Sequence, residues 1–113
     1  MHEMSLTESV VEIALEEARR AGATSIRRIV LDIGRLSSVE PEAMAFCFEA
    51  VSTGTAAAGA VLEICDVEGA GWCPDCGKTV PLTERFGACP DCGGYKVQMT
   101  AGNEMKIRAL EVV

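Results

Sequence analysis

Two nearly identical pentapeptides carry paired cysteines, Cys73-Pro-Asp-Cys76-Gly and Cys89-Pro-Asp-Cys92-Gly, in the spacing C-x2-C-x12-C-x2-C. A gap of two residues lets both thiolates of one turn bind the same ion. The proline favours the turn, and the glycine lets backbone amides fold back toward sulfur. Two such turns facing each other supply four sulfurs in a tetrahedron, which is the ligand set that structural zinc prefers. The sequence therefore predicts a structural Zn²⁺ site, the four-cysteine cluster, made of Cys73, Cys76, Cys89 and Cys92.

Other states of the same cysteines are two disulfides, four unligated thiols or a rubredoxin-like iron site. The doubled spacing favours a metal, and aromatic residues that would surround an iron–sulfur centre make up only 4% of the chain. We find no apolar run of membrane-spanning length and no basic-then-apolar leader, so we expect a cytoplasmic protein without membrane association. Thiols stay reduced in that compartment. Cys47 and Cys65 lie in apolar patterns and are expected to be small buried residues.

The charge of the chain argues against nucleic acid as a partner. Ten basic side chains stand against seventeen acidic ones, a formal net charge of −7. The cysteine-rich stretch is not basic either, whereas nucleic-acid binding needs a cationic surface. A zinc ribbon that binds nucleic acid, an electron carrier and a zinc-stabilised adaptor remain the rival functions. Three aromatic residues of this stretch, Trp72, Phe86 and Tyr95, are expected to form its own small core.

The amino terminus, Met1-His2-Glu3, contains the only histidine of the chain. The free amine of Met1, the backbone nitrogen of His2 and the imidazole of His2 can form fused chelate rings on one metal. A nitrogen-rich, nearly planar ligand set suits Ni²⁺ or Cu²⁺. Glu3 can add its backbone nitrogen or its carboxylate. These residues alone also fit the alternative that His2 is an ordinary polar residue near the chain end.

Nothing in the sequence predicts catalysis. We find no nucleophile–base pair, no paired carboxylates at a recognisable spacing and no Walker-type phosphate loop. Any nucleotide hydrolysis linked to this chain must come from a partner. We therefore expect a protein that is not an enzyme.

Sequence patterns predict the elements that position these residues. A capping box, Ser5-Leu-Thr-Glu8, predicts a helix that runs to about Ala21 and stops at Gly22. Pro41 is well placed to begin a second helix, with Phe46 and Phe48 expected to close the core. The expected order is that first helix, a strand over 25–33, a second helix over 41–52, a strand over 60–67, the cysteine module and a strand over 104–112.

This order predicts an α+β fold in which two helices pack on a small three-stranded sheet. The four-cysteine module, a zinc ribbon, is inserted before the last strand. We expect residues 1–67 and 101–113 to form one α/β domain and residues 68–100 to form the zinc-ribbon domain.

The chain resembles the HypA/HybF family of nickel-insertion accessory proteins in hydrogenase maturation. The resemblance lies in Met1-His2-Glu3 before an amphipathic helix, in the four-cysteine cluster, and in Gly102-Asn103-Glu104-Met105 before the last strand. It covers the whole chain, and the co-occurrence of these motifs in 113 residues is specific.

The resemblance implies a nickel metallochaperone with a structural zinc. It implies that Ni²⁺ binds at the amine of Met1, His2 and Glu3, with a possible contribution from Glu40, and is transferred to the large-subunit precursor of NiFe hydrogenase. It further implies a HypB-type GTPase as partner, and urease maturation proteins as possible additional partners.

Overall fold

A computed structural model describes residues 3–113 of the chain, so Met1 and His2 lie outside the described residues. The chain divides into two compact units. The first comprises residues up to Asp32 together with Val39–Cys65 and Lys106–Val113. The second comprises Ile33–Ser38 and Asp66–Met105, and it contains all four cysteines of the predicted zinc site.

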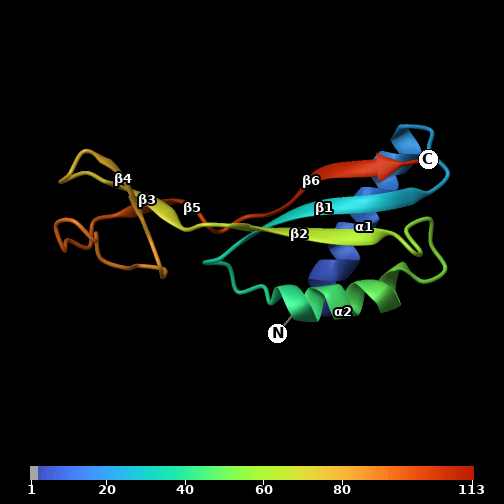
Figure 1. The fold of residues 1–113 in the computed structure, drawn as a ribbon, viewed down its shortest axis with the longest axis horizontal. Helices are drawn as coiled ribbons and strands as arrows, with labels where there is room; N and C mark the ends of the chain where they lie inside the picture. The colour runs from blue at the N-terminus through green and yellow to red at the C-terminus, as the bar shows by residue number, and fades with distance from the viewer. Residues whose placement is uncertain (1–2) are drawn as a thin grey trace. The chain divides into compact units, whose positions relative to one another are not determined.

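Two helices and a three-stranded sheet make up the larger part of the fold (Figure 1). The sheet has the strand order β2-β1-β6, with β1 in the middle. Figure 1 shows β1 and β2 running in the same direction and β6 in the opposite one, so the sheet is mixed. This confirms the predicted α+β fold and the insertion of the cysteine module before the last strand. The elements are α1 (Glu3–Arg20), β1 (Ile26–Gly34), α2 (Pro41–Ser52), β2 (Val61–Val67) and β6 (Met105–Val112).

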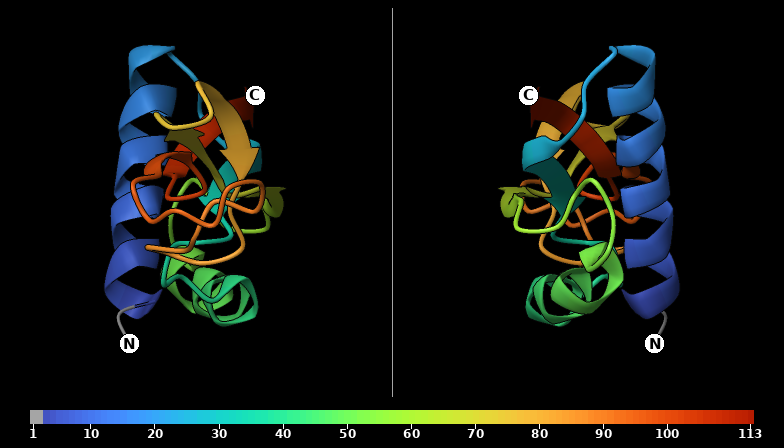
Figure 2. Two further views of the ribbon diagram at one scale, coloured as in Figure 1. Left: turned by 90° about the vertical axis from the view of Figure 1, so that its left-hand side faces the viewer. Right: turned by 90° about the vertical axis from the view of Figure 1, so that its right-hand side faces the viewer.

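The core of the first unit forms where the apolar side of β1 meets the two helices. Ile29 and Leu31 of β1 and Met44 of α2 are fully buried. Helix α1 runs along one face of the sheet (Figure 2), and its small residues Ala14 and Ala18 are buried. Helices α1 and α2 also contact each other. Burial of each large apolar side chain contributes roughly 1.5–3 kcal/mol, so this layer provides most of the stability of the unit.

Helix α1 begins earlier than the capping box predicted. Its first described residue is Glu3, and the Thr7 hydroxyl donates to the Glu3 carbonyl at 2.5 Å within the helix. An acidic residue in the first turn is favourable because the helix dipole places positive charge there. The helix ends at Arg20, close to the predicted end, and Gly22 follows with a φ of 74°. This start places Glu3 in the first turn of α1.

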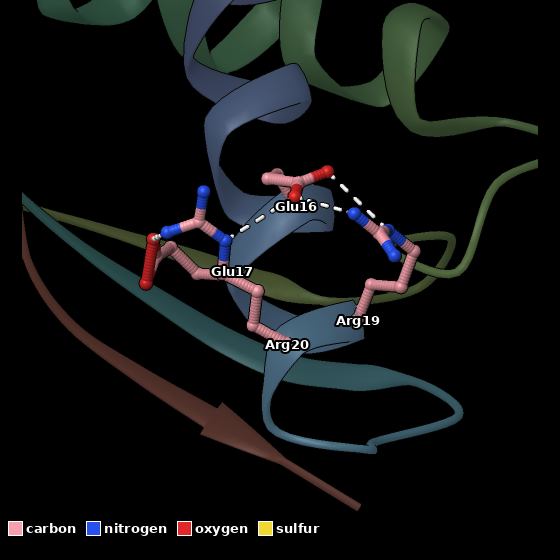
Figure 3. A network of polar contacts seen from close by, with 4 residues as sticks. All are labelled: Glu16, Glu17, Arg19 and Arg20. Atoms are coloured by element: carbon pink, nitrogen blue, oxygen red, sulfur yellow. Dashed lines mark hydrogen bonds and ion pairs between the residues drawn. The ribbon is translucent and has the colours of Figure 1, made fainter.

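The last turn of α1 carries a small network of ion pairs (Figure 3). Glu16 contacts Arg19 at 2.5 Å and Arg20 at 3.3 Å, and Arg20 also lies 3.7 Å from Glu17. Cations at a helix C-terminus interact favourably with its dipole. Because all four side chains are exposed, each pair contributes at most about 1 kcal/mol, and the network stabilises only the end of the helix.

The second unit contains a separate three-stranded antiparallel sheet of short strands. These are β3 (Ala70–Cys73), β4 (Lys78–Pro81) and β5 (Gln98–Ala101), with β3 in the middle. Its buried cluster consists of Cys73, Val80 and Cys89, and the partly buried Cys76 and Val97 pack against it. Cysteines therefore make up most of this cluster, and Ile33, Leu36 and Leu82 are buried elsewhere in the same unit.

The expectation that three aromatic residues form this core is wrong. Trp72, Phe86 and Tyr95 have exposed fractions of 43%, 89% and 78%. Side chains alternate along β3, so Gly71 and Cys73 point inward and Trp72 points outward. Phe46 of α2 is likewise exposed rather than buried. Cys47 and Cys65 are half-buried, less than predicted.

Glycines permit a close backbone approach where the chain enters and leaves the cysteine module. A Cβ on Gly34 would lie 2.0 Å from the carbonyl oxygen of Gly102. The neighbouring Arg85 donates from Nε to the Leu36 carbonyl at 2.8 Å and from its guanidinium to Asn103. The Gly102-Asn103 pair noted in the sequence is thus part of a tight crossing within the second unit.

The buried carboxylate of Asp32 in the first unit forms an ion pair with a residue of the neighbouring strand. Asp32 of β1 is 5% exposed, and Arg108 of β6 donates from Nε to its Oδ2 at 3.3 Å. The Arg108 Nη2 lies 2.7 Å from the Asp32 Oδ1. Arg108 is itself mostly exposed, so it brings a charge to the carboxylate without itself being desolvated.

Replacing Arg108 with Met should therefore leave the Asp32 carboxylate buried without its cation. We expect a loss of about 1–3 kcal/mol in the free energy of unfolding, measured by urea denaturation. Lys106→Met on the same strand is the control and should change stability by less than about 0.5 kcal/mol. The double variant Asp32→Asn/Arg108→Met should recover part of the loss. If Arg108→Met and Lys106→Met lowered the free energy of unfolding by the same amount, this role for Arg108 would be contradicted.

Candidate metal centres

The four-cysteine cluster predicted from the sequence is assembled in the structure. The four Sγ atoms all lie within 4.8 Å of one another. The Cys73 and Cys92 sulfurs are 3.7 Å apart, and the Cys76 and Cys89 sulfurs are 3.8 Å apart. Zinc–sulfur bonds of about 2.3 Å in a regular tetrahedron require sulfur–sulfur distances of about 3.8 Å. The donor set and its spacing therefore fit a tetrahedral metal ion, and within residues 3–113 no other such group of three or more ligands is found.

Backbone hydrogen bonds build the two turns, hereafter the first knuckle (73–77) and the second knuckle (89–93), in the same way. The Gly77 amide donates to the Cys73 carbonyl at 2.8 Å, and the Gly93 amide donates to the Cys89 carbonyl at 2.8 Å. Both glycines have positive φ, 66° and 76°, a conformation that favours glycine. The Asp91 amide also donates to the Cys89 sulfur at 3.4 Å. The glycine bonds close the two turns, and the Asp91 bond also orients the Cys89 thiol.

The thiols affect one another's protonation. Hydrogen bonding with the Cys92 thiol and burial raise the pKa of Cys76 to about 12. Backbone amides, that of Cys92 first, lower the pKa of Cys89 to about 7. Four thiolates this close together repel one another, so a cation is needed to keep all of them ionised.

An ion pair joins the two knuckles outside the sulfurs. The Lys78 ammonium lies 2.6 Å from the Asp91 carboxylate, and this contact raises the pKa of Lys78. Lys78 is the first residue of β4 and is paired with Cys73 in the β3–β4 register. Sequence reasoning did not find this pair, because it depends on the register between strands and on the packing of one turn against the other.

A metal held by four thiolates has no open position. Cys73 and Cys89 are buried, Cys76 is half-buried and only Cys92 is exposed. Among residues 3–113, no carboxylate belongs to the group. Such a closed site suits a structural ion and does not suit an ion that must be exchanged.

The predicted second site falls only partly on described residues. Met1 and His2 lie outside them, whereas Glu3 and Glu40 are described and lie side by side. The Glu40 amide donates to a Glu3 carboxylate oxygen at 3.3 Å. Backbone hydrogen bonds, that of the Glu3 amide first and that of Glu40 also, lower the pKa of the Glu3 carboxyl. Glu40 directly precedes α2 and its side chain makes no cap hydrogen bond to that helix. The fold thus brings two of the four predicted nickel-site residues together.

Comparisons with known proteins agree with this arrangement. The family described as "Hydrogenase/urease nickel incorporation, metallochaperone, hypA" matches residues 1–112. The chain belongs to the HypA family. It is accordingly a nickel metallochaperone of hydrogenase maturation and not an enzyme, as the sequence predicted. None of the helices within residues 3–113 is long and apolar enough to cross a membrane.

Individual HypA relatives match over their full length. The hydrogenase maturation factor HypA of Rhizobium leguminosarum bv. viciae is 62% identical over 113 residues, covering 100% of both chains. That of Dechloromonas aromatica is 56% identical over 112 residues, covering 99% of each. The solution structure of the Ni metallochaperone HypA from Helicobacter pylori has a TM-score of 0.73 at 29% identity, covering 100% of this chain and 98% of that one.

Removing the metal should unfold the part of the second unit around the cysteines, because two of the predicted ligands, Cys73 and Cys89, are themselves buried in its cluster. We expect a strong zinc chelator, applied under reducing conditions, to abolish amide-exchange protection in β3, β4 and β5. Protection in α1 and in the centre of β1 should persist, since the first unit has its own apolar core. Hydrogen exchange measured by mass spectrometry, before and after chelation, distinguishes the two regions. Unchanged protection of β3 would contradict the dependence on metal.

Proposed function

We propose that this HypA-family protein binds Ni²⁺ at its amino terminus and delivers it to the large-subunit precursor of NiFe hydrogenase. The nickel ligands are the Met1 amine, the backbone nitrogen and imidazole of His2, and Glu3. The four-cysteine cluster holds a structural Zn²⁺. One observation carries this division: the cluster is closed by four sulfurs, so a transferred ion must bind elsewhere.

The position of Glu3 supports the amino terminus as that second site. Glu3 stands in the first turn of α1, and its carboxylate accepts a hydrogen bond from the Glu40 amide. This bond directs the carboxylate toward the start of α2. Glu40 is exposed at the same place, so its carboxylate is available as an additional ligand.

The chemistry of these ligands suits transfer. An amine, an imidazole and backbone nitrogens favour Ni²⁺ over harder cations, and the Irving–Williams order places Ni²⁺ above Co²⁺ at such a site. An exposed site with few protein ligands can release its ion to a site with more. We assign residues 1–67 and 101–113 to the nickel-binding domain and residues 68–100 to the zinc-ribbon domain.

We infer the partners of this protein from the absence of a phosphate-binding loop in its sequence and from the description of its family. The sequence contains no phosphate-binding loop, so we infer that a HypB-type GTPase supplies any nucleotide hydrolysis. The family description includes urease, which supports urease maturation proteins as further partners. The net charge of −7 argues against nucleic acid. We place the protein in the cytoplasm, where its thiols would remain reduced.

The nickel site is tested by calorimetric titration of untagged protein and of His2→Ala. We expect about one Ni²⁺ bound tightly per chain by the parent protein and a loss of at least about tenfold in affinity for the variant. Zinc content, measured by elemental analysis, should stay at about one per chain in both. Glu40→Gln removes the Glu40 carboxylate but keeps the backbone amide that contacts Glu3. A loss of nickel affinity in this variant would therefore identify the carboxylate as a ligand.

A protein extended by one glycine before Met1 provides a second, independent comparison. The extension keeps His2 and Glu3 but moves the free amine away from the chelate, so nickel affinity should fall as much as in His2→Ala. If nickel binding is indifferent to both changes, the terminus is not the nickel site. The protein would then be better described as a zinc-stabilised adaptor.

Nickel affinity should also decrease on acidification. The imidazole and amine bind metal only when unprotonated, so protons compete with Ni²⁺ as the pH falls through the ordinary pKa of histidine, about 6.5. We expect tight binding near pH 7.5 and at least about tenfold weaker binding near pH 5.5, measured in the same calorimeter. Affinity independent of pH over this interval would rule out an amine–imidazole chelate.

A further inference from the structure

The two knuckles of the four-cysteine cluster are related by an approximate twofold exchange. Replacing each residue of the first knuckle by its counterpart in the second converts the Cys73–Cys92 contact into the Cys89–Cys76 contact. These two sulfur–sulfur distances, 3.7 and 3.8 Å, are nearly equal. The glycine amide bonds of the knuckles are also equal, at 2.8 Å. The two halves of the cluster are therefore nearly equivalent at the sulfurs and at the turns.

The clearest break lies at the residue directly after each pentapeptide. That residue is Lys78 after the first knuckle and Gly94 after the second. Lys78 reaches across to the aspartate of the opposite knuckle, with its ammonium 2.6 Å from the Asp91 carboxylate. The symmetry-related aspartate, Asp75, lies beside Gly94: a Cβ on Gly94 would be 3.5 Å from its Oδ2. One side of the cluster thus has an ion pair between the knuckles where the other has a glycine.

The side of the cluster that has no ion pair, where Asp75 lies beside Gly94, is also the more exposed side. A Cβ on Gly94 would lie 3.5 Å from the Cys92 sulfur, and Cys92 is the one exposed cysteine of the cluster. On the bridged side, Asp91 is held twice, by the Lys78 ammonium and through its own amide bonded to the Cys89 sulfur. Lys78 is held by its pairing with Cys73 in the β3–β4 register.

We propose that the Lys78–Asp91 ion pair is a positioning device for the metal, holding the two knuckles together on one side of the cluster. Zinc leaves, and competing ligands enter, from the opposite side, at Cys92 beside Gly94. Lys78 and Asp91 touch no metal and act through the knuckles they join. This inference rests on the proposed structural zinc and goes beyond it by setting how fast the ion is lost.

The size of the effect follows from exposure. Residues outside the ligand shell commonly change metal affinity by about 10–100-fold when replaced. Both side chains here are about half exposed, 58% and 49%, which weakens an ion pair through solvent screening. We therefore expect the zinc release rate to rise about threefold to tenfold when the pair is broken.

The experiment measures zinc release from the full-length protein to excess 4-(2-pyridylazo)resorcinol, followed by absorbance under reducing conditions. Lys78→Met and Asp91→Asn should each accelerate release, and the double variant should be no faster than either single variant. The charge-exchanged variant Lys78→Asp/Asp91→Lys should return toward the parent rate. Zinc content of every variant is measured before release, so a variant that fails to fold is recognised.

The Asp91 variant separates positioning from simple electrostatics. If Lys78 only offset the negative charge of a zinc–tetrathiolate centre, removing the nearby negative charge of Asp91 would slow zinc release. If the pair holds the knuckles together, Asp91→Asn must accelerate release, as Lys78→Met does. Slower release from Asp91→Asn would overturn the proposal.

A gain of function gives a second test that does not depend on damaging the fold. Gly94→Lys would place an ammonium beside Asp75 and add the missing ion pair, and the 3.5 Å distances to a Cβ are ordinary van der Waals contacts. We expect release about threefold slower than in the parent. Gly94→Gln, of similar length without charge, is the matched control, and Gly94→Lys in an Asp75→Asn background should lose the gain.

The outcomes distinguish this inference from the function on which it rests. A parent protein without bound zinc would overturn the structural-zinc assignment and the inference with it. If the parent protein holds about one zinc per chain and the variants of Lys78 and Asp91 release zinc at the same rate as the parent, the positioning role alone would be overturned. Nickel titration at the amino terminus is unaffected by either result, because it concerns different residues.

Discussion

The packing of four sulfurs in the second unit is the constraint on which that half of the structure depends. Its strands have four residues each, and the cluster around two buried cysteines contains only Val80 besides them. The other buried apolar side chains of the unit are Ile33, Leu36 and Leu82. An apolar core of this size falls well short of the conformational entropy lost by ordering some forty residues, at roughly 1–2 kcal/mol per residue. A metal bound by all four cysteines adds a large free energy that only the folded state can realise. Two of the predicted ligands, Cys73 and Cys89, are also buried core residues, so we expect coordination and folding of this unit to be coupled.

The first unit meets the opposite requirement. It has an apolar layer between a mixed sheet and two helices, with Leu31 and Met44 fully buried. This layer holds the surface residues of the unit in place. Glu3 illustrates this: helix α1 is fixed by its buried face, and the fixed helix presents Glu3 beside Glu40 at the surface. A stable scaffold under a few exposed ligands suits a protein that must release what it binds.

The apolar periodicity and the positions of glycine and proline predicted the elements well, since Gly22 and Pro41 mark helix boundaries by backbone geometry alone. The cysteine spacing predicted which sulfurs meet. The helix start predicted by the capping box was wrong because α1 already includes Glu3, which places Ser5 inside the helix instead of at its N-cap. The aromatic residues of the cysteine module were misplaced because burial of Trp72 depends on which way β3 faces, and a four-residue strand has too few positions to show it. The chemistry of Met1 and His2 permits a nickel chelate and the family resemblance implies one, and this stays a prediction.

The repeated knuckles show how a small, nearly symmetric site can have two sides that differ in how readily they separate. Two copies of one pentapeptide, each closed by the same glycine amide bond, give a ligand shell whose halves are interchangeable. Everything that distinguishes the halves must come from residues outside the repeat. Lys78 is fixed by a strand register and finds Asp91, whereas its counterpart, Gly94, has no side chain to offer Asp75. Because the sulfur distances are equal on both sides, the difference does not alter the preferred ion. It alters which side of the cluster separates first, and that is a kinetic property carried by two side chains that never contact the metal.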